Sequence, residues 1–123
     1  MKITTLLVAG LLSLPALATE PGDAKTPTQA QLQQLLTGNT LQGEWNGRPF
    51  TQHFAPSGST RYREGDGPKS RGTWSVNAKG QYCSVWLPSP AEACYDVLVK
   101  DNNVLWKSGG KIHPTIVTKG DTF

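Results

Sequence analysis

The sequence is poor in the side chains that carry most enzymatic and metal chemistry. Its 123 residues include only two cysteines and two histidines. His53 and His113 stand apart, and neither has an H-x-H or H-x-x-E pattern around it, so the spacing of a metal site is missing. No serine lies in a G-x-S-x-G context, the usual setting of a nucleophilic serine. We therefore predict no catalytic set, no bound metal and no cofactor.

The acidic residues do not form a recognisable catalytic pair either. Two catalytic carboxylates must lie close together, with one of them in apolar surroundings. Most of the acids here fall in or beside predicted turns, where carboxylates are ordinarily solvated. Asp96 lies within a predicted strand. An enzyme would become the better hypothesis if Asp96, His53 and Glu44 met in one pocket.

Long apolar runs are absent beyond residue 18, and the run before it is short. The chain begins with a lysine at position 2, continues with an apolar stretch and reaches an Ala-x-Ala ending at Ala18, which are the three parts of a secretory signal. A helix needs about 20 apolar residues to cross a bilayer, more than this stretch provides. We predict a signal peptide over residues 1–18, cleavage before Thr19, no membrane span, and a location in the periplasm or outside the cell.

The two cysteines allow one disulfide. In an exported chain an even cysteine count favours a bridge, and the C-x-x-C spacing of redox or metal-binding pairs is missing. Folding the predicted strand 82–87 back on 94–100 places Cys83 opposite Cys94, with Cβ atoms about 5 Å apart. We predict a Cys83–Cys94 disulfide that stabilises the fold by about 3 kcal/mol.

The formal charge of +3 is small, and removal of the signal lowers it to +2 because one lysine leaves. This balance does not indicate a nucleic-acid-binding protein. Positive side chains nevertheless gather at Arg61, Arg63, Lys69 and Arg71 around a Gly/Pro loop. Arg61 and Arg63 point to the same face of a predicted strand. This face is a candidate site for an anionic ligand, although a solvated barrel face with Glu64 and Asp66 as counter-charges is the favoured interpretation.

One short helix and many strands make up the predicted fold, a single domain over residues 28–123. Residues 19–27 are rich in proline, glycine and charge, which predicts a flexible leader. A leucine stripe between Thr28 and Gly38 predicts a helix over 28–37. Eight strands are expected at Thr40–Trp45, Pro49–Phe54, Ser59–Arg63, Arg71–Val76, Tyr82–Leu87, Cys94–Lys100, Val104–Lys107 and Ile112–Thr118. Short turns between them predict a mainly β, antiparallel meander that closes into a small barrel or a strongly bent sheet.

Four tryptophans are many for a chain of this length. In a small sheet protein most tryptophans belong to the core, and we assign Trp74 and Trp86 to packing. Trp45 stands beside an Asn-Gly turn and is expected to reach solvent. We therefore count Trp45, with Arg61, Arg63 and Arg71, among the candidate ligand-binding residues.

Several short motifs resemble a family of small exported bacterial proteins without an assigned activity. They are Gly38-Asn39-Thr40 with Gly43, Gly72-x-Trp74-x-Val76, and Cys83 followed by Cys94-x-x-Val97. The resemblance implies an exported all-β domain with a bridged hairpin. A weaker likeness, through the segment 118–121, is to periplasmic C-type lysozyme inhibitors, although the chain lacks their early paired cysteine.

These observations favour a monomeric, non-enzymatic periplasmic binding or accessory module, whose partner is a small ligand or another protein. The alternative is a protein inhibitor of a cell-wall hydrolase, related in kind to the lysozyme inhibitors.

Overall fold

The computed structural model describes residues 22–123. The predicted signal peptide, its cleavage after Ala18 and the first residues of the predicted leader lie outside the described residues. Within them the chain forms one helix, α1 (Gln29–Leu36), followed by nine strands. The strands are β1 (Thr40–Trp45), β2 (Arg48–Phe54), β3 (Ser59–Glu64), β4 (Ser70–Val76), β5 (Tyr82–Trp86), β6 (Glu92–Tyr95), β7 (Val97–Lys100), β8 (Asn103–Ser108) and β9 (Lys111–Thr118).

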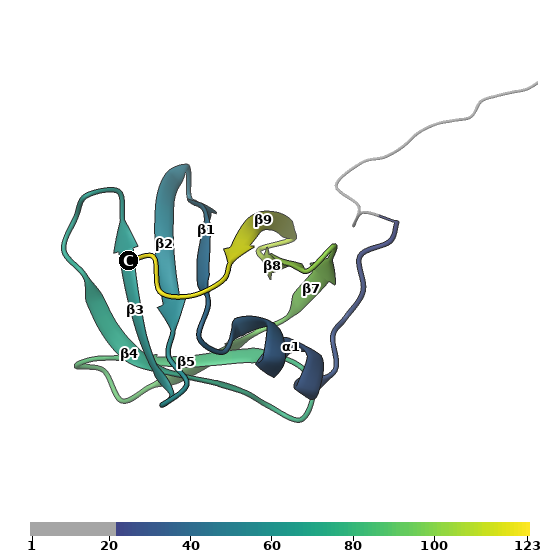
Figure 1. Cartoon of the computed structure of the whole chain (residues 1–123), viewed down its shortest axis with the longest axis horizontal. Coiled ribbons are helices and arrows are strands. Elements are labelled where there is room, and N and C mark those ends of the chain that lie inside the picture. Colours follow the sequence, from purple (N-terminus) through teal and green to yellow (C-terminus); the bar gives the residue numbers. More distant parts are fainter. Residues whose placement is uncertain (1–21) are drawn as a thin grey trace, which may run out of the picture.

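Helix α1 is bounded by a capping box at Thr28 and by a glycine, Gly38, after its last turn. The Thr28 hydroxyl accepts a hydrogen bond from the Gln31 amide, and the Gln31 side chain accepts one from the Thr28 amide, which forms a capping box. Gly38 then leaves the helix with a φ of +78°, a conformation that glycine adopts without strain. Leu32 and Leu36 are fully buried, so the helix covers one end of the sheet (Figure 1).

The strands form one antiparallel sheet in the order β6-β5-β4-β3-β2-β1-β9-β8-β7. Its two outermost strands, β6 and β7, are consecutive in the chain and are separated only by Asp96. The Lys107 amide donates a hydrogen bond to the Asp96 carbonyl at 3.2 Å, which joins β8 to the point where β6 becomes β7. The sheet thus curls round until its ends meet (Figure 1). The prediction of a mainly β meander closing into a small barrel is confirmed.

The single strand expected over 94–100 is divided in two. Its first part, β6, pairs with β5, whereas its second part, β7, pairs with β8. The chain changes partners at Asp96 because one continuous segment has to serve both ends of the closing sheet. The two halves therefore count as separate strands, which gives nine strands where the pattern predicted eight.

The predicted disulfide is present. Cys83 and Cys94 are direct partners in the β5–β6 register, and their sulfurs are bonded at 2.07 Å. The bridge fixes the outer side of this hairpin two residues before the change of partner at Asp96.

Part of the predicted leader, residues 22–27, contacts the barrel. Lys25 and Val99 exchange two backbone hydrogen bonds, at 3.0 and 2.8 Å, and Asp23 lies 3.4 Å from the Lys100 ammonium. The physical reason is the change of partners at Asp96. Once β6 has turned toward β5, the outer edge of β7 has backbone groups to pair, and the leader pairs with them.

The core lies inside the barrel, on the side that α1 covers. Alternate residues of each strand point inward, as the period of two requires. The buried apolar cluster consists of Leu32, Leu36, Leu41, Phe50, Phe54, Trp74, Val76, Tyr82, Val97, Val104 and Trp106. Phe54 is at its centre, with the Trp74 and Tyr82 rings meeting its ring edge to face at 5.5 and 5.7 Å. Trp74 thus belongs to the packed core, in line with its assignment from the sequence.

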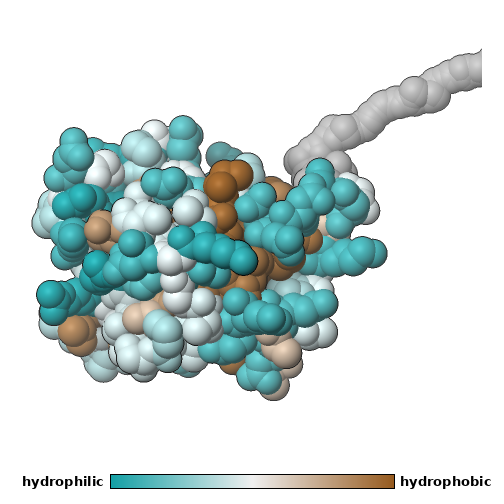
Figure 2. All heavy atoms as spheres, viewed as in Figure 1, coloured by the Kyte–Doolittle hydropathy of each residue, from teal (hydrophilic) through white to brown (hydrophobic). Residues whose placement is uncertain are grey.

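The outer faces of the strands are more polar. Figure 2 shows one side of the molecule covered largely by hydrophilic residues, with a band of hydrophobic residues over β9 and its neighbours. Ile116 on β9 is 58% exposed. Among residues 22–123 no helix has the length and hydropathy needed to span a membrane.

Candidate functional site

The barrel is closed at one end and hollow at the other. Helix α1 covers the end where β4 finishes, and the Gln29 side chain donates a hydrogen bond to the Val76 carbonyl there. Toward the opposite end lies a cavity of about 360 Å³. Seven aromatic side chains line it: Trp45, Phe50, Tyr62, Tyr82, Trp86, Tyr95 and Trp106. We call this space the aromatic cavity.

One wall of the aromatic cavity is a run of touching rings. Phe50 and Tyr62 stack with ring centroids 5.3 Å apart, and Trp86 meets Tyr62 edge-on at 5.9 Å. These rings come from β2, β3 and β5, so β4 must leave room between the last two. It does so with Gly72, where a Cβ atom would contact the Val85 carbonyl and lie 2.9 Å from the Trp86 ring. The absence of a side chain at Gly72 therefore shapes this wall.

A second pair of rings lies across the barrel. Trp106 on β8 packs against Tyr82 with centroids 5.0 Å apart. Strands β3 and β8 are on opposite sides, because the same number of strands separates them in either direction once β6 and β7 are taken as one crossing strand. Tyr62 and Trp106 therefore line the aromatic cavity from opposite sides of the barrel.

The buried polar groups of the aromatic cavity gather at one place. The Gln52 amide donates hydrogen bonds to the Thr60 hydroxyl at 3.0 Å and the Tyr82 hydroxyl at 2.9 Å. Ser84, 3% exposed, is also hydrogen-bonded to Tyr82. Burial raises the pKa of Tyr82 to about 12, while the hydrogen bonds from Ser84 and Gln52 act in the opposite direction. All these groups are therefore neutral near pH 7.

Charged groups lie nearer the ends of the strands. Glu64 and Lys107 both line the aromatic cavity. The Tyr62 hydroxyl donates to a Glu64 carboxylate oxygen at 2.9 Å, and the Arg48 guanidinium is 3.8 Å from the other oxygen. Burial raises the pKa of Tyr62, and the Glu64 carboxylate raises it further. The cavity thus has a neutral interior and a charged rim.

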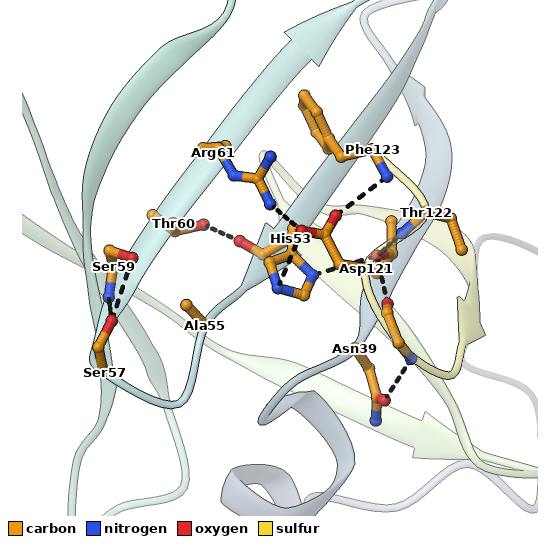
Figure 3. Close-up of polar contacts among 12 residues, drawn as sticks. Asn39, His53, Ala55, Ser57, Ser59, Thr60, Arg61, Asp121, Thr122 and Phe123 are labelled. Atoms are coloured by element: carbon orange, nitrogen blue, oxygen red, sulfur yellow. Dashed lines mark hydrogen bonds and ion pairs between the residues drawn. The ribbon is translucent and has the colours of Figure 1, made fainter.

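The predicted cationic face lies outside the barrel and is occupied by the chain itself. Residues 119–123 cross over β1 and β2 and reach β3 (Figure 3). The Arg61 guanidinium pairs with the Asp121 carboxylate at 2.5 Å. The Phe123 ring has Arg61 and Lys69 each 4.9 Å from its centroid and Arg63 at 5.8 Å, all within cation–π range. The Asp121 carboxylate thus pairs with a side chain of the face that was a candidate site for an anionic ligand.

Thr40 on β1 also binds the segment 119–123. Its hydroxyl donates to the Gly120 carbonyl at 2.7 Å and accepts from the Thr122 amide at 3.1 Å. Since the hydroxyl proton is directed at Gly120, the 3.2 Å contact with His53 Nδ1 requires the imidazole to donate. We call the segment 119–123, together with Thr40, His53 and Arg61, the clasp.

His53 is a buried member of the clasp. Only 6% of the residue is exposed, although it points away from the barrel interior, because the segment 119–123 lies over it. Its Nε2 atom is 3.9 Å from the Asp121 carboxylate. Hydrogen bonding to the Phe123 amide lowers the pKa of Asp121 most, and Arg61 and His53 lower it further. These contacts account for His53 as a residue that packs beneath the C-terminal segment and helps to hold it.

Asp96, His53 and Glu44, whose meeting in one pocket would have favoured an enzyme, lie apart in the structure. Glu44 is exposed near the cavity end of β1, whereas His53 pairs with Thr40 at the start of that strand. Asp96 lies between β6 and β7, exposed, and accepts a hydrogen bond from the Gln81 side chain at 2.9 Å. His113 packs separately, with its ring 4.9 Å from that of Trp45.

One group of potential metal ligands occurs among residues 22–123. It consists of Cys83, Glu92 and Cys94. Both sulfurs are joined in the disulfide, so neither is present as the thiolate that metals bind. This group does not form a metal centre while the bridge is intact.

The structure separates the four candidate ligand-binding residues. Trp45 lines the aromatic cavity, while Arg61 and Arg63 hold the clasp and Arg71 is exposed on the outer face of β4. Sequence reasoning missed the cavity because its rings look like core residues: Trp86 was assigned to packing and instead lines the cavity, half-buried. The available signal was the alternation itself, which directs Trp86 and Tyr82 to one face of β5.

No protein-family model and no curated protein matches the chain. The function is therefore inferred from the geometry of the site.

Proposed function

We propose that this protein is an exported, non-enzymatic binding module that takes a small ring-bearing ligand into the aromatic cavity. One observation carries the proposal: seven aromatic side chains surround about 360 Å³ at the open end of a barrel whose other end is covered by a helix. Ligand sites are typically concave, mostly apolar, and supplied with a few fixed polar groups. Barrels of about eight strands have room for one small ligand at this position.

The rigidity of the surrounding sheet supports binding. The Cys83–Cys94 disulfide joins β5 to β6, and these strands carry Tyr82, Trp86 and Tyr95. Rings that are held in place before the ligand arrives lose little conformational entropy when it binds. The cavity therefore needs little rearrangement to accept a flat molecule.

The proposed location is the periplasm or the exterior of the cell. A disulfide persists in such oxidising compartments, and the first eighteen residues have the pattern of a secretory signal. Mass spectrometry of the exported protein tests this part, because cleavage after Ala18 leaves Thr19 as the first residue. The binding unit is proposed to be the monomer, since the aromatic cavity is built within one chain.

Binding is tested by titrating the exported protein with a panel of ring compounds while following tryptophan fluorescence and thermal unfolding. A true ligand at one hundred times its Kd should raise the free energy of unfolding by about 2.7 kcal/mol. Trp86→Leu should weaken binding at least about tenfold, because ring contacts dominate such sites. Arg71→Gln, on the outer face of β4, is the control and should leave it unchanged. If no compound alters either signal at millimolar concentration, the proposal fails.

One feature favours a second function, inhibition of a cell-wall hydrolase. The loop between β5 and β6 exposes Leu87 by 69%, and the Cys83–Cys94 bridge fixes the hairpin that carries it. A rigid loop with an exposed apolar side chain is suited to entering an enzyme cleft. Lysozyme assays with and without the protein decide the matter: unchanged lysis at micromolar excess eliminates this function.

A further inference from the structure

The polarity of the aromatic cavity is concentrated at one spot. Gln52, Tyr82 and Ser84 are each 5% exposed or less, and Tyr82 is hydrogen-bonded to both of the others. The other uncharged lining residues are aromatic, apart from Ser70 and Leu87. The charged residues Glu64 and Lys107 lie toward the ends of their strands, where they are half-exposed.

This distribution restricts the ligand. A charged group placed beside Gln52 and Tyr82 would lose its hydration without an opposite charge to replace it. A sugar carries hydroxyls around its whole ring and would leave most of them facing aromatic walls without partners. An entirely apolar compound would gain no hydrogen bond from the Gln52 amide or from the Tyr82 and Ser84 hydroxyls.

We propose, on the basis of the proposed function, that the ligand is a neutral aromatic compound bearing one hydroxyl or carbonyl group. Its ring occupies the aromatic cavity, which Tyr62 and Trp106 line from opposite sides. Its oxygen points inward to the Gln52, Tyr82 and Ser84 cluster. An amide and hydroxyls can each donate or accept, so this cluster suits a phenol and a ring ketone alike.

Four probes separate the ligand classes by equilibrium dialysis against the exported protein. They are 2-naphthol, naphthalene, 2-naphthoate and maltose, which represent a hydroxylated ring, a bare ring, a charged ring and a sugar. We expect 2-naphthol to bind at least about five times more tightly than naphthalene, the effect of one or two good hydrogen bonds. Binding of 2-naphthoate and maltose should be weaker than that of naphthalene.

Removing single hydroxyls locates the polar contact. Tyr82→Phe and Ser84→Ala should each weaken 2-naphthol binding by about three- to tenfold and leave naphthalene binding unchanged. Ser75→Ala is the matched control, because Ser75 lies on the outer, exposed face of β4 and loses the same group. Naphthalene binding also reports whether a variant has kept its folded cavity.

The outcomes distinguish this inference from the proposed function. If naphthalene binds as tightly as 2-naphthol, or if neither hydroxyl deletion weakens 2-naphthol binding, the ligand class is wrong although the cavity binds rings. If maltose or 2-naphthoate binds most tightly, the class is likewise overturned. If no probe binds and the wider panel also fails, the proposed function falls with it.

Discussion

Replacing Thr40 by valine should release the clasp. The substitution exchanges the hydroxyl for a methyl group of nearly the same shape and keeps the branched side chain that suits a strand. Three contacts disappear: the bond to the Gly120 carbonyl, the bond from the Thr122 amide and the contact with His53 Nδ1. The first two partners lie in an exposed segment, so water can replace the hydroxyl there at a cost of about 1 kcal/mol each. The buried imidazole loses its acceptor and adds a similar amount.

The expected loss in the free energy of unfolding is therefore about 2 to 3 kcal/mol, equivalent to a fall in Tm of at least about 8 °C. Urea unfolding measures the energy, and hydrogen exchange of the Thr122 amide measures the release directly. Thr40→Ser is the control, because it keeps the hydroxyl and loses one buried methyl, about 1 kcal/mol. If Thr40→Val unfolds within 0.5 kcal/mol of the parent, or if the Thr122 amide stays protected, the hydroxyl does not hold the clasp.

Three other perturbations probe the barrel itself. Replacing both Cys83 and Cys94 by alanine should lower the free energy of unfolding by about 3 kcal/mol, as measured in urea, because the bridge closes a loop of eleven residues' separation. Raising the pH from 10 to 12 should cost the parent about 2 kcal/mol more than Tyr82→Phe, because the unfolded chain ionises at the ordinary pKa of 10.0 and the folded residue only at about 12. Gly72→Ala should destabilise by about 1 to 3 kcal/mol and shift the tryptophan emission, since its Cβ would collide with the Val85 carbonyl and the Trp86 ring.

Each of these has its own check. Reduction of the parent with dithiothreitol should reproduce the double cysteine variant, and a parent insensitive to reduction would contradict the entropic account of the bridge. Equal loss of stability in alkali by the parent and Tyr82→Phe would mean that this phenol does not titrate as argued. Thr73→Val, at the neighbouring outward-facing position, is the control for Gly72→Ala. An alanine variant with parental stability would show that both the β5 backbone at Val85 and the Trp86 ring can move aside.

Local patterns carried the prediction of the fold a long way. The leucine stripe, the turn residues and the cysteine spacing each depend on neighbours within a dozen residues, and all three were found as expected. The break at Asp96 could not be seen, because Cys94–Lys100 reads as one continuous strand. The change of partner there depends on the position of β8, which lies at the opposite end of the sheet from β5. Such closure is a property of the whole barrel.

The candidate site was harder to predict for two different reasons. The clasp joins residues about 60 to 80 positions apart through side chains, as in Arg61 with Asp121, and such contacts leave no periodic signal. The aromatic cavity uses the same inward positions as the core, so Trp86 and Tyr62 are indistinguishable from packing residues in a pattern of alternation. Cavity-lining residues differ from core residues in their distance from the end of the barrel that α1 covers. That distance is defined only once the whole sheet has assembled.

Strand β3 ties the outside of the barrel to its inside. Arg61 and Arg63 point outward to the clasp, while Tyr62 and Glu64 point inward to the aromatic cavity. Because successive side chains alternate, a slip of one residue in this strand would send cations into the hollow and rings into the solvent. The strand consequently has a single workable alignment with β2 and β4. A deletion of one residue within β3 should therefore cost both features together.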